Sequence, residues 1–233
     1  MFDIYKAEER YIADHGWLKS NFSFSFAEYY DPANMQFGPM RVLNDDIVQP
    51  LRGFGAHPHR EMEIVSIVLK GQLKHEDSTG KSAVTTYGGI QRMSAGTGVI
   101  HSEVNPSANE AVNFLQLWFM PEEYGLTPSY ERTEFDPAKM ENALLPVVSK
   151  INGENVAYIH QDLTIYLSDL EAEKELTFYQ EAGRRIFFFM IEGKVTLNQQ
   201  YKLEKRDSAR ITEKQELQIK ASRNARFMLI DLP

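Results

Sequence analysis

The 233-residue sequence predicts an all-β protein made of two small domains, each a sandwich or barrel. Three observations support this prediction. Many runs of strand length are apolar or alternate in polarity, turn-forming residues separate them, and one strand–turn–strand pattern occurs in both halves of the chain. Short strands separated by turns at such spacing are typical of β-sandwiches and barrels.

The expected strands differ in how they are covered. Residues 22–26 read Phe-Ser-Phe-Ser-Phe, so three aromatic side chains would share one face of a strand. Residues 62–69 and 112–120 are apolar on both faces, as in strands covered on both sides. Turn-forming residues between these runs occupy positions 77–81, 87–89 and 95–98.

The internal repeat indicates two domains. Residues 67–73 and 189–195 each contain an apolar strand, a charged residue, a glycine and a second strand, with Gly71 and Gly193 at the turns. Further along, residues 114–121 resemble residues 227–233. Two matches in the same order favour a duplicated architecture.

A single short helix is expected near the middle of the chain. Within residues 136–143, Asp136 is suited to cap the helix and Pro137 to occupy its first turn. We therefore predict a first domain over residues 1–133, a linker with this helix over 134–154, and a second domain over 155–233.

Composition excludes several classes of function. The chain has no cysteine, which excludes disulfides and thiolate catalysis, so any metal must be held by nitrogen and oxygen. The net charge of −8 predicts no direct binding to nucleic acid. A polar N-terminus and the absence of any apolar run near the roughly 20 residues that span a bilayer predict no membrane segment and a cytoplasmic location.

Two histidine pairs are the strongest indication of chemistry. In an extended strand, residues i and i+2 point the same way, so His57 and His59 share a face, as do His101 and Glu103. An isolated pair of this kind often means nothing, but two matching pairs predict a metal site. Three imidazoles and a carboxylate suit iron, manganese, nickel, copper, cobalt or zinc and can leave positions open for a substrate.

The remaining candidate residues are assigned weaker roles. Glu63 could be a ligand, a partner for the N–H of a histidine, or a salt-bridge residue, and we favour the partner role. His15 and His160 are expected to be structural, and His75 is expected to be a solvated strand residue.

These residues resemble the pirin family of bicupins. The resemblance rests on residues 53–60 (Gly-Phe-Gly-Ala-His-Pro-His-Arg), on Gly71 and on residues 93–103, and it extends over most of residues 15–130. The match is most similar to the bacterial branch described as quercetin 2,3-dioxygenase-like pirins. Glu61 and Met62 depart from it, because many relatives have Gly-Phe before the glutamate.

The resemblance implies a fold, a metal site and a reaction. It implies two stacked cupin barrels (double-stranded β-helix, or jelly-roll) with one divalent metal, held in the N-terminal barrel by His57, His59, His101 and Glu103. It further implies a dioxygenase that cleaves a flavonol such as quercetin with O2, with Glu103 taking the hydroxyl proton. Phe54, Met62 and Met93 are the expected wall residues of the substrate pocket.

A second hypothesis assigns a different role to the same metal. Some pirins resemble metal-dependent partners of other proteins, so the chain could be a regulatory protein without turnover of its own. A third possibility is a cupin whose metal only stabilises the barrel. We expect a monomer, because two fused barrels would cover one another's open faces.

Overall fold

The computed structural model describes residues 1–233, and contacts divide the chain into two compact units. The first contains Tyr11–Phe135 and Lys150–Gln161; it holds all six histidines of the chain and is called the histidine unit below. The second, called the C-terminal unit, contains Met1–Arg10, Asp136–Ser149 and Asp162–Pro233. The predicted domain ranges follow chain order and stay a prediction. The two units alternate along the chain instead: residues 1–10 belong to the C-terminal unit and residues 150–161 to the histidine unit.

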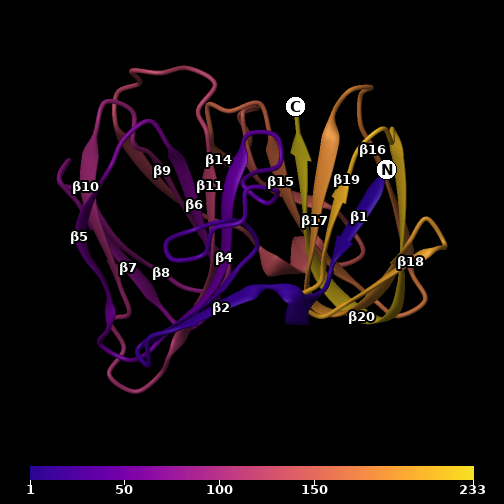
Figure 1. The fold of residues 1–233 in the computed structure, drawn as a ribbon, viewed down its shortest axis with the longest axis horizontal. Coiled ribbons are helices and arrows are strands. Elements are labelled where there is room, and N and C mark those ends of the chain that lie inside the picture. Colours follow the sequence, from indigo (N-terminus) through magenta and orange to yellow (C-terminus); the bar gives the residue numbers. More distant parts are fainter. The chain divides into compact units, whose positions relative to one another are not determined.

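The histidine unit consists of two antiparallel sheets (Figure 1). A seven-stranded sheet has the order β12-β9-β6-β11-β4-β3-β2, and a four-stranded sheet has the order β5-β10-β7-β8; the short strand β14 (Ala157–Tyr158) lies outside both. The strands of the unit are β2 (Tyr11–Asp14), β3 (Leu18–Phe22), β4 (Met40–Val48), β5 (Gly53–His59), β6 (Glu63–Lys70), β7 (Leu73–Asp77), β8 (Ser82–Thr85), β9 (Gly89–Ser94), β10 (Val99–Val104), β11 (Val112–Phe119), β12 (Ser129–Glu134) and β14 (Ala157–Tyr158).

Most of the strands expected in this unit are confirmed. The apolar runs at 62–69 and 112–120 become β6 and β11, which pair with each other and are buried over most of their length. The expected strand at 22–26 is wrong, because β3 ends at Phe22. The chain then folds back, with Phe24 fully buried and Phe26 bridged to Tyr29, so a core position and not a strand face explains these aromatic residues.

The C-terminal unit is built around two long strands, β17 (Arg185–Leu197) and β20 (Glu216–Leu232). At one end of this pair, the strands follow the order β1-β19-β17-β20-β15-β13. Further along the pair, β18 pairs with β17 and β16 pairs with β20. Register shifts between Met190 and Val195 let both strands bend between these two sets of partners. The other strands are β1 (Phe2–Tyr5), β13 (Leu145–Ser149), β15 (Thr164–Leu170), β16 (Glu175–Tyr179), β18 (Tyr201–Glu204) and β19 (Ser208–Ile211).

Helical structure is limited to two single turns of 3-10 helix, η1 (Ala7–Glu9) and η2 (Pro137–Met140). The second lies in the predicted position: the Asp136 side chain accepts a hydrogen bond from the backbone N–H of Ala138, and Pro137 begins the turn. No helix has the length and apolar character needed to cross a membrane.

The repeated glycine has the same structural role in both units. Gly71 and Gly193 have φ angles of 79° and 84°. A Cβ on Gly71 would lie 2.8 Å from the carbonyl oxygen of Ala111, and one on Gly193 would lie 2.1 Å from that of Asn224. Gly71 lies at a turn between β6 and β7, whereas Gly193, where a turn was also expected, lies at a register shift within the continuous strand β17. In each unit the backbone at this glycine packs so closely against another segment that only glycine fits.

This close approach makes Gly193 more sensitive than another glycine with similar backbone angles. Gly183 also has a positive φ, of 90°, but its Cβ would meet nothing within 4 Å. We expect Gly183→Ala to cost about 1–2 kcal/mol for the left-handed backbone. Gly193→Ala should cost roughly 1–3 kcal/mol more because the backbone of β20 must move. Urea unfolding of both variants tests this, and equal losses would contradict it.

Candidate metal centre

Strand alternation brings three of the four residues of the two pairs, His57, His59 and His101, together. In β5, His57 and His59 are half-buried while Pro58 between them is exposed. In β10, His101 and Glu103 are buried and Ile100 is exposed. The strands are antiparallel neighbours with His57 directly opposite His101, so the three imidazoles meet on one face of the sheet.

The three histidines form a compact cluster. Their ring centroids lie 4.5 to 4.8 Å apart, and each ring offers a nitrogen within 4.8 Å of the others. The Nε2 atoms of His57 and His101 are 3.1 Å apart. Two metal–nitrogen bonds of about 2.1 Å at a right angle would separate their nitrogens by roughly 3.0 Å. The spacing therefore fits two neighbouring ligands of one transition metal.

The protonation states of the cluster also fit a metal. His57 donates its Nδ1–H to the carbonyl oxygen of Gly55 at 2.7 Å, which leaves a lone pair on Nε2. The Nε2 of His59 is buried and has no hydrogen-bond partner. Burial, together with the neighbouring histidines, lowers the pKa of His59 to about 4 and that of His101 to about 2. Both rings are therefore neutral near pH 7, as metal binding requires.

Glu103 lies on the same face as His101 but is held by other groups. One carboxylate oxygen accepts from the Ser66 hydroxyl at 2.9 Å, and the other accepts from the side-chain amide of Gln116. Burial raises the pKa of Glu103, although these two hydrogen bonds oppose the shift. The carboxylate is not one of the three converging groups, so its predicted role as a ligand stays a prediction.

Glu63 is the partner of a histidine, but of His160 and not of a member of the imidazole cluster. Its carboxylate accepts from the Ser94 hydroxyl, from the His160 ring and from the backbone N–H groups of His160 and Gln161. The prediction assumed one straight strand from His57 to Glu63. The chain instead turns at Glu61, whose φ is 49°, and Glu63 begins β6 in the other sheet. Glu63 therefore fixes residues 160–161, and His160 is the structural histidine that was expected.

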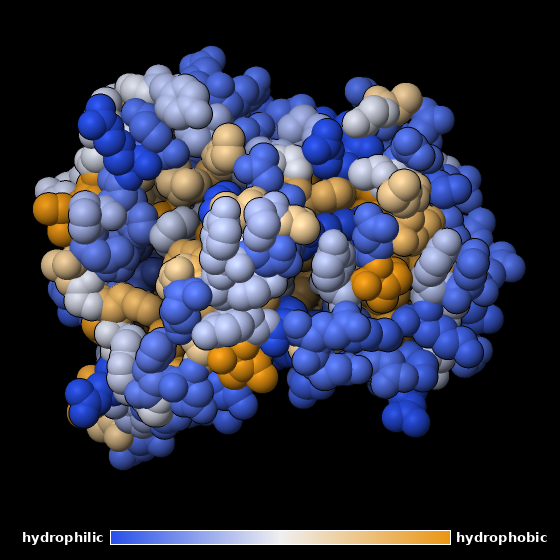
Figure 2. Space-filling model, in the orientation of Figure 1, coloured by the Kyte–Doolittle hydropathy of each residue, from blue (hydrophilic) through white to orange (hydrophobic).

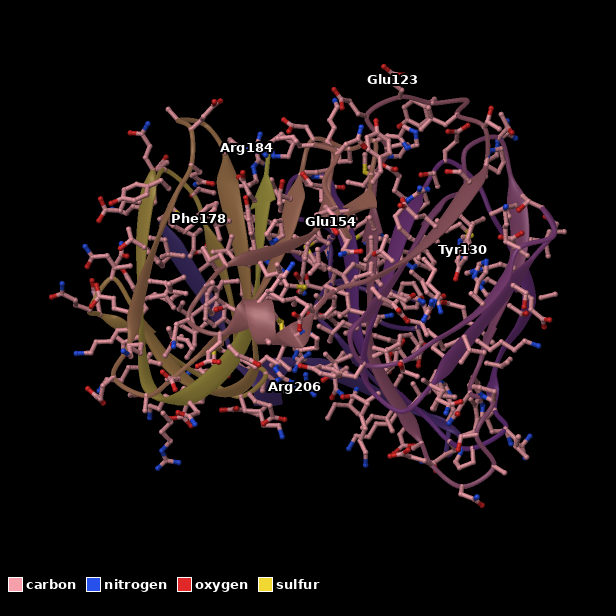
Figure 3. The ribbon with its side chains drawn as sticks, turned by 180° about the vertical axis from the view of Figure 1, so that it is seen from behind. Glu123, Tyr130, Glu154, Phe178, Arg184 and Arg206 are labelled. Carbon is pink, nitrogen blue, oxygen red and sulfur yellow. The ribbon has the colours of Figure 1, made fainter.

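His75 is a buried member of the site that was expected to be solvated. It is 1% exposed, stacks on Tyr130 with the ring centroids 4.0 Å apart, and lies beside His101. Figure 3 labels Tyr130 among the strands of the histidine unit. The charged neighbours Lys74 and Glu76 suggested a solvated segment, but side chains alternate along β7 and residues 73 and 75 are the buried ones. That alternation was visible in the sequence and could have identified His75.

A cavity of about 460 Å³ opens beside His57, a volume in the range of small-molecule sites. Its aromatic lining comes from Trp17, Phe22, Phe26, Phe54 and Trp118. Phe54, one of the expected wall residues, is part of this lining, and its place in the substrate site stays a prediction. Apolar residues also reach the surface of the histidine unit on the face shown in Figure 2, among hydrophilic ones.

The other two predicted wall residues lie elsewhere. Met62 and Met93 pack in a separate apolar cluster with Ile64, Ala95 and Val99, and neither lines the large cavity. Met93 instead borders an interior space of about 10 Å³ next to His101 and Glu103. Met62 directly precedes β6 and Met93 lies in β9, and both strands belong to the seven-stranded sheet, not to the sheet that carries the imidazole cluster.

The polar part of the cavity lining contains a carboxyl with an unusual pKa. Asp46 is buried and accepts a hydrogen bond from the Ser20 hydroxyl. Burial raises its pKa from 3.8 to about 7, with Ser20 opposing the shift. Asn44 beside it carries a buried side-chain oxygen without a hydrogen-bond partner. The cavity therefore offers hydrogen-bonding groups as well as aromatic walls.

Replacing Asp46 should change how stability depends on pH. Between pH 3.8 and about 7 the folded protein binds more protons at Asp46 than the unfolded chain, so its free energy of unfolding falls as pH rises. Asp46→Asn removes this loss. Relative to the original protein, we expect the variant to gain up to roughly 4 kcal/mol between pH 3.5 and 8. Unfolding curves at both pH values measure the gain, and a pH-independent difference would contradict the account.

Comparison with known proteins agrees with this architecture. The family model described as pirin matches residues 5–119, and the one described as a quercetinase C-terminal cupin domain matches residues 146–232. Quercetin 2,3-dioxygenase of Escherichia coli is 40% identical over 233 residues, covering 100% of this chain and 99% of the relative. A putative quercetin 2,3-dioxygenase of Mycobacterium tuberculosis is 39% identical over 91% of this chain and 86% of its own.

Solved structures give the same result. YhhW from Escherichia coli superimposes with a TM-score of 0.96 at 40% identity, covering 100% of this chain and 98% of that one. The complex of bacterial pirin YhhW with nickel(II) has a TM-score of 0.94 at 39% identity, covering 100% and 99%. The predicted all-β fold with two cupin domains is thereby confirmed, and this chain belongs to the pirin family.

Proposed function

We propose that this protein is a metal-dependent dioxygenase that cleaves a flavonol such as quercetin with O2. The observation that carries the proposal is the position of His57, which belongs both to the imidazole cluster and to the lining of the aromatic cavity. A flat aromatic ligand in that cavity would therefore lie next to the metal centre. The names of the relatives support the same activity, and the nickel(II) complex of YhhW supports a metal at the centre.

The proposed ligands are His57, His59, His101 and Glu103. Three imidazoles and a carboxylate accept nickel, iron, manganese, copper, cobalt or zinc. When bound, the metal supplies Lewis-acid chemistry that lowers the pKa of a coordinated hydroxyl and orients the anion for reaction with O2.

The side chains supply binding and proton transfer. The walls formed by Trp17, Phe26 and Trp118 hold the flat rings and exclude water. Glu103 takes the proton of the flavonol hydroxyl, and its raised pKa makes it a better base than an exposed glutamate. The indole N–H of Trp118 donates to Gln116 at 3.3 Å, and Gln116 in turn donates to Glu103, so the cavity wall also orients the base.

The metal site is tested by titration of the metal-free protein with Ni²⁺. We expect one equivalent to bind, and His59→Ala to weaken binding at least about tenfold because a ligand is lost. His15→Ala is the matched control, because His15 is exposed and lies outside the imidazole cluster. Absence of binding by the original protein, or equal affinity for the two variants, would contradict the site.

Glu103→Gln tests the proposed base. Turnover, followed as loss of quercetin absorbance together with O2 uptake, should fall by roughly 10²–10⁴. The control is Glu63→Gln, at a second buried glutamate. This variant should keep turnover but lose about 1–3 kcal/mol of unfolding free energy, because an amide cannot accept from both backbone N–H groups. If the original protein binds metal but leaves flavonols intact, the dioxygenase proposal fails, and the regulatory, partner-binding hypothesis gains support.

A further inference from the structure

A chain of three side chains runs inward from the metal centre along β10 and β7. The Nδ1 of His101 lies 3.3 Å from the Nδ1 of His75, and the Nε2 of His75 lies 2.9 Å from a carboxylate oxygen of Asp77. His101, His75 and the Asp77 side chain are all almost fully buried. Neither His75 nor Asp77 has a role in the reaction proposed above.

The direction of these hydrogen bonds follows from the partners of Asp77. Its Oδ1 accepts from the backbone N–H groups of Thr79 and Lys81 and from the Thr79 hydroxyl, so this oxygen has a fixed position. Its Oδ2 faces His75 and can only accept, which places the proton of His75 on Nε2. The Nδ1 of His75 then carries a lone pair and accepts from Nδ1–H of His101.

This order of protons leaves the lone pair of His101 on Nε2, the atom that faces His57. We propose that Asp77 and His75 are positioning residues of the metal centre, which hold His101 in the tautomer that can bind the ion through Nε2. The inference rests on the metal site of the proposed function but not on its substrate. Tyr130 stacks on His75 with an angle of 10° between the rings, which fixes the plane of the His75 ring.

His57 reaches a binding-competent state differently. His57 is oriented by the carbonyl oxygen of Gly55, a backbone group that cannot be altered by substitution at that residue. His101 depends on side chains alone. A substitution at Asp77, which contacts His101 only through His75, can therefore invert the tautomer of His101.

Asp77→Asn is expected to invert it. The Oδ1 position must remain an oxygen, because two backbone N–H groups donate to it. The amide NH₂ therefore replaces Oδ2 and donates to Nε2 of His75, which moves the proton of His75 to Nδ1. His101 then accepts at Nδ1 and carries a proton on Nε2, where it opposes the metal. We expect Ni²⁺ affinity to fall about 10- to 100-fold.

Glu76→Gln is the matched control, since it removes one charge from the same strand at an exposed side chain paired with Lys74. It should bind Ni²⁺ like the original protein. Equal affinity of Asp77→Asn and Glu76→Gln would overturn the proposal. Binding is measured without a flavonol, so the result can be interpreted even if the protein has no dioxygenase activity. Failure of the original protein to bind Ni²⁺ would instead count against the metal site itself.

A second measurement does not depend on whether Asp77→Asn folds. In the original protein loaded with Zn²⁺, ¹⁵N spectra of the six histidines report which ring nitrogen carries a proton. The proposal predicts His75 protonated at Nε2 and His101 protonated at Nδ1. A His75 protonated at Nδ1 alone, or a His101 bound through Nδ1, would overturn it.

Discussion

The pairing of β5 with β10 is the contact on which the candidate centre depends. It places His57 directly opposite His101, and alternation along β5 adds His59 on the same side. Burial lowers the pKa of His59 and of His101, so both rings are neutral near pH 7 and can offer lone pairs to a cation. The register of this pair therefore determines whether a metal site exists, because a shift of one residue would turn these side chains to the opposite face.

The buried carboxylates of the histidine unit differ in function because their partners differ. Glu63 accepts from backbone N–H groups of residues 160–161 and is structural. Glu103, two residues after His101, accepts from the side chains of Ser66 and Gln116, and burial raises its pKa. Asp77 is fixed by a turn and orients His75. Residue type alone could not assign these roles, since each is set by the donors that surround the carboxylate.

The sequence was informative wherever local periodicity determines structure. The two i, i+2 pairs, the apolar strands β6 and β11, and the turn at Pro137 all depend on residues close together in the chain, and the structure agrees with them. The glycine repeat was equally visible, because Gly71, between β6 and β7, and Gly193, at a register shift within β17, both lie where a larger side chain would clash.

The sequence was uninformative where the chain changes direction or sheet. The turn at Glu61 separates Glu63 from the histidines, and the same turn leads Met62 away from the cavity. Trp17 and Trp118 were missed because they reach the cavity from strands and loops distant in sequence. The domain ranges could not anticipate that Met1–Arg10 would belong to the C-terminal unit, through pairing of β1 with β19.

The most direct test of the account is X-ray absorption at the nickel edge of the protein loaded with one equivalent of Ni²⁺. The account predicts scattering from three imidazole rings bound through nitrogen, with oxygen completing the coordination. A spectrum with fewer than two imidazoles, or one unchanged by His59→Ala, would contradict it.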